Sequence, residues 1–361
     1  MNTHIFVVGR HPELSLAEIK SVFSILGISH TIEKAEKQTL VIATAEELDT
    51  GTLMKRLGGT IKIGQRLLSS GSIEETILRH LAAVQIGKIV FSITGQNDRA
   101  IALRLKKELK SQGRSARYIE SKNTATILHN QLVEHQGDIT IIDGAVFVTK
   151  AIQPIESLGE RDFGRPYRDA KSGMLPPKLA MMMINLAGQS LGATILDPFC
   201  GSGTILMEAA TIGYTNLMGS DISPKAIDDT RQNFAWQGGS LPKKLFVADA
   251  RKISAFLPKD SVDAIITEPY LGKPLRGSEP ESVLASQTKE LARLYHDCFI
   301  ELDKILRPGG AVVIIIPAFQ SKTDWIKINV AFPWTKTVSF FYARPGQRVG
   351  REIVVLKKLS A

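Results

Sequence analysis

Apolar runs alternate with helical patterns of apolar positions over the first 71 residues. The runs predict three strands, at residues 4–9, 39–45 and 60–68. Helical spacing predicts two helices between them, at residues 16–27 and 47–59. Ser15 and Glu18 have the spacing of a capping box, which would begin the first helix. Two strand–helix–strand units indicate a small ferredoxin-like α+β domain over residues 1–71.

The alternation continues between residues 72 and 155 in a different order. Helices are expected at 74–84, 100–113 and 124–135, and strands at 88–95, 116–121, 138–143 and 145–152. These elements predict a second domain over residues 72–155. Four prolines between residues 154 and 177 interrupt any regular pattern, because proline fixes φ and cannot donate to a ladder. We therefore expect a linker over residues 156–177.

From residue 178 to residue 361 the pattern is typical of one α/β domain. A helix is expected at 178–192, and strands are expected at 193–198, 216–221, 243–250, 262–269 and 310–319. Helical segments between these strands predict a mostly parallel sheet with helices on both faces. Residues 336–359 contain two further strand patterns joined by a Gly/Pro-rich turn, which predict an antiparallel hairpin at one edge. The fold class is therefore α/β, preceded by α+β domains.

Composition excludes several classes of protein. Apolar residues make up 43% and charged residues 22% of the chain, so a sizeable core can form and global disorder is excluded. No run of 18 uninterrupted apolar residues occurs, and the N-terminus lacks a secretory signal, so we expect a cytoplasmic protein with no membrane partner. Cys200, Cys298 and seven scattered histidines without an HExxH pair form neither a disulfide framework nor a zinc motif, so no metal is expected.

Charge indicates a polyanionic partner without proving one. The chain carries 45 Lys and Arg against 36 Asp and Glu, a net charge of +9. This charge suits nucleic acid, although many basic proteins bind none. Basic residues concentrate on and just beyond the predicted helix at 100–113, namely Arg104, Lys106, Lys107, Lys110, Arg114 and Arg117. Their spacing predicts a cationic ridge, which is either an RNA-binding surface or an ordinary solvated helix face.

Four consecutive predicted strands end in an acidic residue: Asp197, Asp221, Asp249 and Glu268. In an open α/β sheet, ligands bind beyond the carboxyl ends of the strands. Asp is common wherever a strand gives way to a turn, so one such residue carries little weight. Four of them in successive units predict carboxylates that line one crevice.

The first of these acids opens a glycine-rich turn, Asp197-Pro-Phe-Cys-Gly201-Ser-Gly203-Thr204. Gly201 and Gly203 allow the backbone to approach a ligand closely and to enter the next helix tightly. The turn is not a complete dinucleotide fingerprint, because Leu206 occupies the third glycine position. Asp197 would repel a pyrophosphate and attract an ammonium group, and the chain has no GxxxxGK[ST] phosphate loop.

A ligand with a ribose and a cationic amino-acid tail suits these groups. Asp221 follows Gly203 by 18 residues, close to the spacing at which an acid holds ribose hydroxyls. Asp249 could accept a hydrogen bond from an adenine amino group. S-adenosylmethionine has all of these parts, and its sulfonium and ammonium groups both favour an acidic crevice. We therefore expect S-adenosylmethionine as the cofactor.

The fourth acid lies in Glu268-Pro269-Tyr270, a set suited to methylation of a base amine. The lone pair of an exocyclic amine is delocalised into the ring, so its nitrogen is a poor nucleophile. A carboxylate and a fixed carbonyl can accept its two hydrogens, and an aromatic ring can stack on a flipped-out base. Glu268, the Pro269 carbonyl and Tyr270 are therefore the candidate catalytic residues. A proline-containing strand end without chemistry is the alternative.

The motifs Asp-Pro-Phe-Cys-Gly-Ser-Gly at 197–203 and Thr-Glu-Pro-Tyr at 267–270 resemble those of class I S-adenosylmethionine-dependent amino-methyltransferases. GRHPELSLAEI at 9–19, the basic segment at 72–160 and GRPYRDAKSGMLPPKLAMMMINLAG at 164–188 narrow the resemblance. Together the segments are similar to THUMP-domain tRNA guanine-N2-methyltransferases that act on guanosine 10.

The resemblance implies a C-terminal Rossmann-like class I methyltransferase domain and a THUMP domain over residues 72–155. It implies methyl transfer to N2 of a guanosine in tRNA, with the tRNA held through the cationic ridge. Residues 174–178 would pass over the methionine part of the cofactor. The cofactor contacts that it implies are Asp197, Phe199, Gly201, Gly203, Asp221, Asp249, Ala250 and Lys178.

The target-base motif departs from the family pattern. Related enzymes usually have Asp-Pro-Pro-Tyr, and this chain has Glu-Pro-Tyr at 268–270. Either Glu268 acts as the acid with Tyr270 shifted by one position, or Tyr270 keeps the stacking role and the acid moves. The alternative functions are a DNA or rRNA amino-methyltransferase acting on adenine or cytosine, and an inactive RNA-binding homologue. The sequence leaves open the nucleotide position, mono- or dimethylation, the oligomeric state and any accessory subunit.

Overall fold

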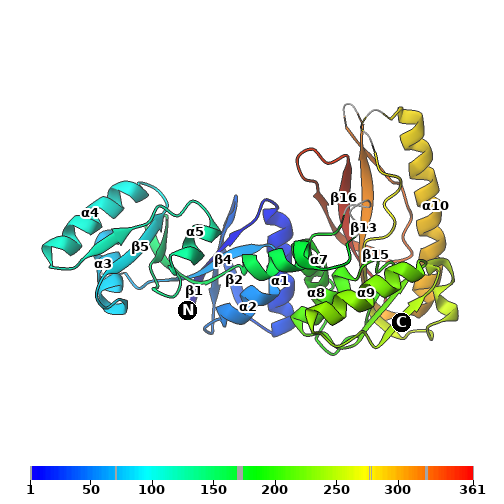
Figure 1. Ribbon diagram of the computed structural model, residues 1–361, viewed down its shortest axis with the longest axis horizontal. Coiled ribbons are helices and arrows are strands. Elements are labelled where there is room, and N and C mark those ends of the chain that lie inside the picture. Colours follow the sequence, from blue (N-terminus) through cyan, green and yellow to red (C-terminus); the bar gives the residue numbers. More distant parts are fainter. Residues whose placement is uncertain are drawn as a thin grey trace. The chain divides into compact units, whose positions relative to one another are not determined.

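The computed structural model describes residues 2–69, 71–168, 174–275, 277, 279–321 and 324–360. Two compact units make up the chain. The first contains residues 1–16 and 26–157, and the second contains residues 17–25 and 158–361. Figure 1 shows their helices and strands, some of them labelled, and these elements confirm the α/β class expected from the sequence.

The first unit is built on an eight-stranded sheet in the order β2-β3-β1-β4-β8-β7-β5-β6. Its strands are β1 (Asn2–Val8), β2 (His30–Glu36), β3 (Thr39–Thr44), β4 (Thr60–Arg66), β5 (Ile89–Thr94), β6 (Ala116–Tyr118), β7 (Asp138–Ile142) and β8 (Ala145–Ile152). The helices of this part of the chain are α1 (Pro12–Leu26), α2 (Thr50–Arg56), α3 (Ile73–Val84), α4 (Asp98–Ser111) and α5 (Thr124–His129). Because β4 pairs with β8, residues from the two predicted N-terminal domains share one sheet. The domain boundaries at residues 71, 155 and 177 stay predictions.

Strand β2 and the start of helix α1 differ from expectation, and the helix expected at 124–135 ends at His129. Strand β2 has no counterpart in the sequence analysis, because it is an edge strand whose residues are polar and largely exposed. The capping box at Ser15 and Glu18 is wrong, since helix α1 begins at Pro12, whose fixed φ suits the first helical position. Ser15 lies inside the helix, where its hydroxyl donates to the carbonyl oxygen of His11 at 3.1 Å.

A buried charge cluster joins the central strands of this sheet. Lys62 on β4 and Asp138 on β7 form an ion pair with an Nζ–Oδ2 distance of 2.8 Å and side-chain exposures of 8% and 0%. Ser92 on β5 donates to Asp138 Oδ1 at 2.6 Å, and Thr149 on β8 donates to Asp138 Oδ2 at 2.6 Å. A buried ion pair needs such additional hydrogen bonds to offset its desolvation. Asp138 therefore holds four strands in register.

Replacing Asp138 with alanine should strongly destabilise the first unit. The variant leaves the buried Lys62 ammonium without its partner, which costs about 3–5 kcal/mol of unfolding free energy. Urea denaturation of the full chain, with hydrogen exchange in β4, β7 and β8, measures this loss. Glu74→Ala is the matched control, because it removes only the exposed partner of Arg104. Equal small losses in the two variants would contradict this account.

The second unit contains an eight-stranded sheet in the order β11-β10-β9-β12-β13-β16-β15, with β14 paired to β13. Its strands are β9 (Ile195–Asp197), β10 (Leu217–Asp221), β11 (Lys244–Val247), β12 (Val262–Thr267), β13 (Leu306–Gln320), β14 (Trp325–Lys327), β15 (Thr335–Tyr342) and β16 (Val349–Lys357). The helical elements from the unit boundary onward are α6 (Ile155–Gly159), η1 (Glu160–Gly164), α7 (Pro177–Leu186), α8 (Thr204–Ile212), α9 (Pro224–Gln237), η2 (Ala250–Ala255) and α10 (Glu281–Ile305).

Strand direction in this sheet confirms the expected architecture. Strands β11, β10, β9, β12 and β13 are parallel neighbours. Strand β16 is antiparallel to both β13 and β15, so the predicted C-terminal hairpin is present. The chain proceeds from β9 to one side through β10 and β11, and then to the other side through β12 and β13. A ligand crevice is expected where this reversal occurs, between β9 and β12.

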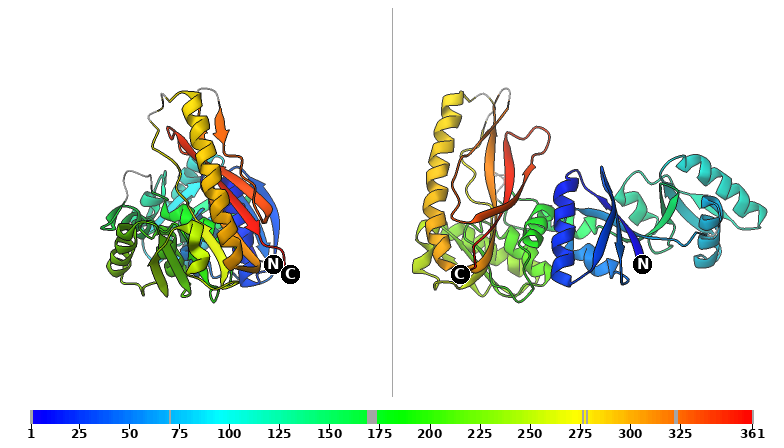
Figure 2. Two further views of the ribbon diagram at one scale, coloured as in Figure 1. Left: turned by 90° about the vertical axis from the view of Figure 1, so that its right-hand side faces the viewer. Right: turned by 180° about the vertical axis from the view of Figure 1, so that it is seen from behind.

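Helix α10 covers the strands that follow this reversal. Its residues Tyr295 and Phe299 belong to the same buried cluster as Val312 and Ile314 of β13. Figure 2 shows α10 running alongside β13 and β16. This packing of α10 on β13 stabilises the part of the sheet that lies next to β12. Among the described residues, no helix combines the length and apolar character needed to cross a bilayer.

Candidate active site

A cavity of about 850 Å³ lies beyond the carboxyl ends of β9, β10, β11 and β12. Its volume suits a small-molecule ligand. The four predicted acids, Asp197, Asp221, Asp249 and Glu268, all line it. Other predicted residues on its walls are Phe199, Gly201, Ala250, Pro269 and Tyr270. Gly203 and Lys178 are not among the lining residues, so the structure does not bring these two into the same wall.

Asp197 is a buried carboxylate at the centre of the cavity wall. Its Oδ1 accepts from the backbone N–H of Phe199 at 3.1 Å and from Thr267 Oγ1 at 2.7 Å. Burial raises the pKa of Asp197 to about 7, and the nearby Asp221 and Glu268 carboxylates act in the same direction against these hydrogen bonds. Among the described residues, no ion pair is recorded for Asp197. Such a carboxylate favours a positively charged ligand.

Asp221 is held by the backbone of two turns. Gly201 N donates to Asp221 Oδ2 at 3.0 Å, and Ser223 N donates to Oδ1 at 2.9 Å. Gly203 is the N-cap residue of helix α8 and has a φ of +89°, and a Cβ there would lie 2.9 Å from Thr230 Cγ2. Glycine is therefore required at 203 for the tight entry into the helix, although this residue does not face the cavity.

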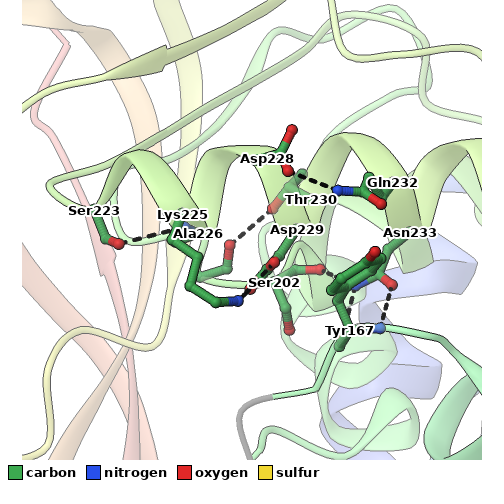
Figure 3. Close-up of polar contacts among 11 residues, drawn as sticks. Tyr167, Ser202, Ser223, Lys225, Ala226, Asp228, Asp229, Thr230, Gln232 and Asn233 are labelled. Carbon is green, nitrogen blue, oxygen red and sulfur yellow. Dashed lines mark hydrogen bonds and ion pairs between the residues drawn. The ribbon is translucent and has the colours of Figure 1, made fainter.

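Side chains of helix α9 donate hydrogen bonds to the backbone of the glycine turn (Figure 3). Thr230 Oγ1 donates to the carbonyl oxygen of Gly201 at 2.8 Å, and Asn233 Nδ2 donates to that of Ser202 at 2.8 Å. The Asn233 side chain also donates to the Tyr167 carbonyl oxygen at 2.9 Å and accepts from the Tyr167 N–H at 3.1 Å. Asn233 is fully buried. One amide group therefore fixes both the turn and the predicted linker.

The predicted linker supplies part of the cavity wall. Met174 and Leu175 line the cavity, as does Arg168. Buried Arg165 donates from Nη1 to Thr204 Oγ1 at 2.6 Å and contacts Met174 Sδ from Nη2 at 3.2 Å. Residues 169–173 lie outside the described part of the chain. Lys178, at the start of α7, is exposed, and partial desolvation of its ammonium group lowers its pKa.

Asp249 is already paired within the cavity wall. Its carboxylate accepts from Arg251 Nη2 at 2.6 Å and from Arg251 Nε at 3.0 Å. The backbone N–H of Arg251 donates to the same group at 2.9 Å. The Arg251 guanidinium lowers the pKa of Asp249. A hydrogen bond from an adenine amine to this carboxylate would compete with that pair.

The predicted catalytic residues directly follow β12. The Glu268 carboxylate accepts from Arg351 Nε at 2.6 Å and is largely buried, with a side-chain exposure of 14%. Burial raises the pKa of Glu268, and Arg351 acts against this shift. Tyr270 is 53% exposed, and its carbonyl oxygen accepts from the Tyr295 hydroxyl at 2.6 Å. The acid and the aromatic ring of the motif therefore belong to one cavity wall.

The cationic ridge belongs to the first unit, on helix α4, the loop after it and strand β6. Lys106, Lys107, Lys110 and Arg117 are exposed. Arg104 is paired with Glu74 at 2.6 Å, and Arg114 donates to the carbonyl oxygen of Gln85 at 2.6 Å. The residues of α4 that face the core are Ile101, Ala102, Leu105 and Leu109. The helix thus has one buried apolar face and an outer face with three lysines.

Comparison with known proteins identifies the domain that holds the cavity. The family described as RMKL-like, methyltransferase domain, matches residues 165–347, just over half of the 361 residues. The chain belongs to this methyltransferase family. All the residues that line the cavity lie within the matched range.

Individual relatives of this methyltransferase are consistent with the family. This chain is 25% identical to a tRNA (guanine(10)-N2)-dimethyltransferase of Methanothermobacter thermautotrophicus, over 88% of this chain and 90% of the relative. It is 34% identical to a tRNA (guanine(6)-N2)-methyltransferase of Thermus thermophilus, over 44% of each chain. The crystal structure of TrmN from Thermus thermophilus superposes with a TM-score of 0.57 at 19% identity, over 99% of this chain and 100% of that chain. This superposition shows a shared fold.

The cavity of the methyltransferase fits S-adenosylmethionine, the cofactor expected from the sequence. Buried Asp197 suits the ammonium group, and Asp221 suits the ribose hydroxyls. Ile222, which is 66% exposed and lines the cavity, offers an apolar surface for the adenine ring. Ile222 and Arg351 are two residues of the site that the sequence patterns do not predict. The apolar residue directly after Asp221 was a signal that could have identified Ile222, whereas nothing in the sequence links Arg351 to Glu268.

Cofactor affinity should depend on pH through Asp197. Because an ammonium ligand favours the ionised carboxylate, the dissociation constant for S-adenosylhomocysteine should rise about tenfold per pH unit below 7. Asp197→Asn should weaken binding at pH 8 by about 10- to 100-fold, the effect of one charged hydrogen bond, and should remove the pH dependence. Titration calorimetry measures both effects.

The matched control for this prediction is Asp228→Asn on helix α9. Asp228 is exposed and accepts from Gln232 Nε2 at 2.6 Å, away from the cavity. Its substitution should leave the affinity and its pH dependence as in the unmodified protein. A pH-independent affinity in the unmodified protein would contradict the role given to Asp197.

Proposed function

We propose that this enzyme transfers a methyl group from S-adenosylmethionine to the exocyclic N2 amine of a guanosine in tRNA, at position 10. The observation that carries the proposal is that Glu268, Pro269 and Tyr270 line the same cavity as Asp197 and Asp221. A base-binding set thus adjoins a cofactor-binding set. The relative aligned over 88% of this chain is named for position 10 of tRNA, which supports that nucleotide.

Bound S-adenosylmethionine supplies a methyl group on a sulfonium, and the sulfur keeps the bonding pair to give S-adenosylhomocysteine. Asp197 holds the ammonium group, and Asp221 orients the ribose. The target nitrogen forms the new N–C bond with its lone pair and then loses one proton, which restores a neutral amine. Because the methylated nitrogen is strongly acidic, the proton can pass to a carboxylate or to water without a tuned base.

Glu268 and its neighbours present the base to the methyl group. The Glu268 carboxylate and the Pro269 carbonyl accept the two amine hydrogens and increase the electron density on nitrogen. The exposed ring of Tyr270 stacks on the flipped-out guanine. The hydrogen bond from Tyr295 to the Tyr270 carbonyl fixes the backbone that carries this ring. This arrangement assigns the acid role to Glu268 despite the shortened motif.

The cationic ridge of the first unit supplies affinity for the tRNA. Lys106 and Lys110 are four residues apart on α4, and Lys107 lies beside them on the exposed face. Lysines on such a face release counterions from phosphates and bind without regard to sequence.

We place the activity in the cytoplasm, since Cys200 and Cys298 are both free and buried and the tRNA substrate is found there.

Purified enzyme with labelled S-adenosylmethionine tests the proposed reaction. We expect label in tRNA that lacks the modification, and nucleoside analysis should find N2-methylguanosine or its dimethyl form. A tRNA transcript with guanosine 10 replaced by adenosine should accept no label. Label at guanosine 6, in U6 RNA or in duplex DNA, without label at guanosine 10, would overturn the assignment.

Glu268→Gln should lower the rate of methyl transfer by about 10²–10⁴-fold, because the amide cannot accept a hydrogen as strongly as a carboxylate. Affinity for S-adenosylhomocysteine should stay nearly unchanged, since the cofactor contacts remain. Single-turnover kinetics and calorimetry measure the two quantities. Glu281→Gln, at the exposed start of α10, is the matched control. Equal losses of rate and cofactor affinity in Glu268→Gln would contradict the role given to this residue.

Replacing Lys106, Lys107 and Lys110 together with glutamine should weaken tRNA binding and flatten its salt dependence. Each lost phosphate contact reduces the slope of log K against log salt. Filter binding over a range of salt concentrations measures the slope. Affinity for S-adenosylhomocysteine is the internal control and should not change. An unchanged slope would mean that these lysines form an ordinary solvated face.

A further inference from the structure

A buried ion pair connects the candidate catalytic acid to the C-terminal hairpin. Arg351 Nε donates to Glu268 Oε1 at 2.6 Å, and the side-chain exposures are 5% for Arg351 and 14% for Glu268. Arg351 lies on β16, where it pairs with Pro317 of β13 and Tyr342 of β15. Glu268 follows β12, on the other side of β13. The guanidinium group therefore reaches across one strand to meet the acid.

Of the charged and titratable groups in the described part of the chain, the others near Glu268 do not stabilise its negative charge. Asp197 on β9 is a second carboxylate, so its charge opposes ionisation of Glu268. Tyr295 on α10 donates its hydroxyl hydrogen to the Tyr270 carbonyl oxygen instead. Within the described residues, Arg351 is the cation recorded in an ion pair with Glu268. Burial disfavours the ionised form of this acid, and among the described residues the Arg351 guanidinium is the group that favours it.

Stability alone is a weak reason for this pair. Removing two charges from water costs several kcal/mol per ion, and buried ion pairs can often be replaced by apolar residues without loss of stability. An ion pair that served only stability would be expected to lie in the core, away from any ligand cavity. Glu268 instead lines the cavity that holds the cofactor-binding acids. Its position favours a role in the reaction.

We propose that Arg351 is the positioning residue for Glu268, keeping its carboxylate ionised and oriented toward the amine of the target base. This inference rests on the proposed function. During transfer, the ionised carboxylate accepts a hydrogen bond from the amine while the nitrogen lone pair forms the N–C bond. The proton that nitrogen then loses can pass to the carboxylate or to water. A protonated Glu268 would instead present an O–H group and could not accept in the same way.

The ion pair with Arg351 explains why position 268 holds glutamate, whose side chain is one methylene longer than that of aspartate. Related enzymes usually have the shorter aspartate in their motif, whereas the carboxylate here must reach Arg351 across β13. Glu268→Asp would withdraw the carboxylate from the guanidinium by one carbon–carbon bond. We therefore expect Glu268→Asp to show the same change in pH dependence as a loss of Arg351.

The pH profile of single-turnover methyl transfer to tRNA tests the proposal. In Arg351→Met, the acidic limb should move to higher pH by about 1–3 units, the effect of removing an opposite charge near a carboxylate. Arg351→Lys keeps a cation and should recover part of the shift. Arg351→Gln keeps a donor of similar length and replaces the methionine variant if that variant does not fold. A rate lowered equally at every pH would indicate a structural role and overturn the proposal.

Arg348→Met is the matched control on the same hairpin. Arg348 is exposed and donates to Gln320 Oε1 at 3.0 Å, so its loss removes one positive charge without touching Glu268. Its pH profile should match that of the unmodified enzyme. A shift of the same size in Arg348→Met and Arg351→Met would show a general charge effect and overturn the proposal.

A second measurement needs no methyl transfer. Carbon-13 NMR of glutamate-labelled protein, with Glu268→Gln used to assign the signal, follows the titration of the Glu268 carboxyl directly. This titration should move to higher pH in Arg351→Met and stay in place in Arg348→Met. If the unmodified enzyme methylates no RNA, the proposed function fails, and the titration still decides whether Arg351 controls Glu268. A titration unchanged in Arg351→Met overturns the inference even if the enzyme is active.

Discussion

Negative charge concentrated at one end of a parallel sheet is the constraint on which the rest of this methyltransferase depends. Strands β9, β10, β11 and β12 end together, and each delivers a carboxylate to one cavity. The protein neutralises two of these groups itself, Asp249 with Arg251 and Glu268 with Arg351. The remaining two, Asp197 and Asp221, are held by hydrogen-bond donors that carry no full charge. A cationic cofactor is the expected partner of these two carboxylates.

The geometry of the cavity depends on contacts that are themselves neutral. Asn233 holds the glycine turn and the linker with one buried amide, and Thr230 adds a second bond to the turn. On the opposite side, Tyr295 fixes the carbonyl of Tyr270 from helix α10. Buried amides and hydroxyls suit this role, because they orient backbone groups without adding charge to an acidic site. Helices α9 and α10 thus frame the cofactor half and the base half of the cavity.

Most of the site could be predicted from the sequence because parallel strands end at the same edge of a sheet. Once the strand–helix alternation was recognised, Asp197, Asp221, Asp249 and Glu268 had to lie together. The partner of Glu268 could not be predicted, since Arg351 is placed by the register of β16 on β13. Lys178 is exposed on α7 and does not line the cavity, an outcome of helix phase and packing that spacing alone does not show. Strand β2 was overlooked because edge strands with polar residues lack an apolar pattern.

A crystal structure of the enzyme with S-adenosylhomocysteine tests the central claim most directly. The account predicts the ammonium group within hydrogen-bond distance of the Asp197 carboxylate and the ribose hydroxyls on Asp221. The adenine should lie against Ile222, and the sulfur should face the wall that carries Glu268 and Tyr270. An ammonium group directed into solvent, or a ribose bound away from Asp221, would contradict the account.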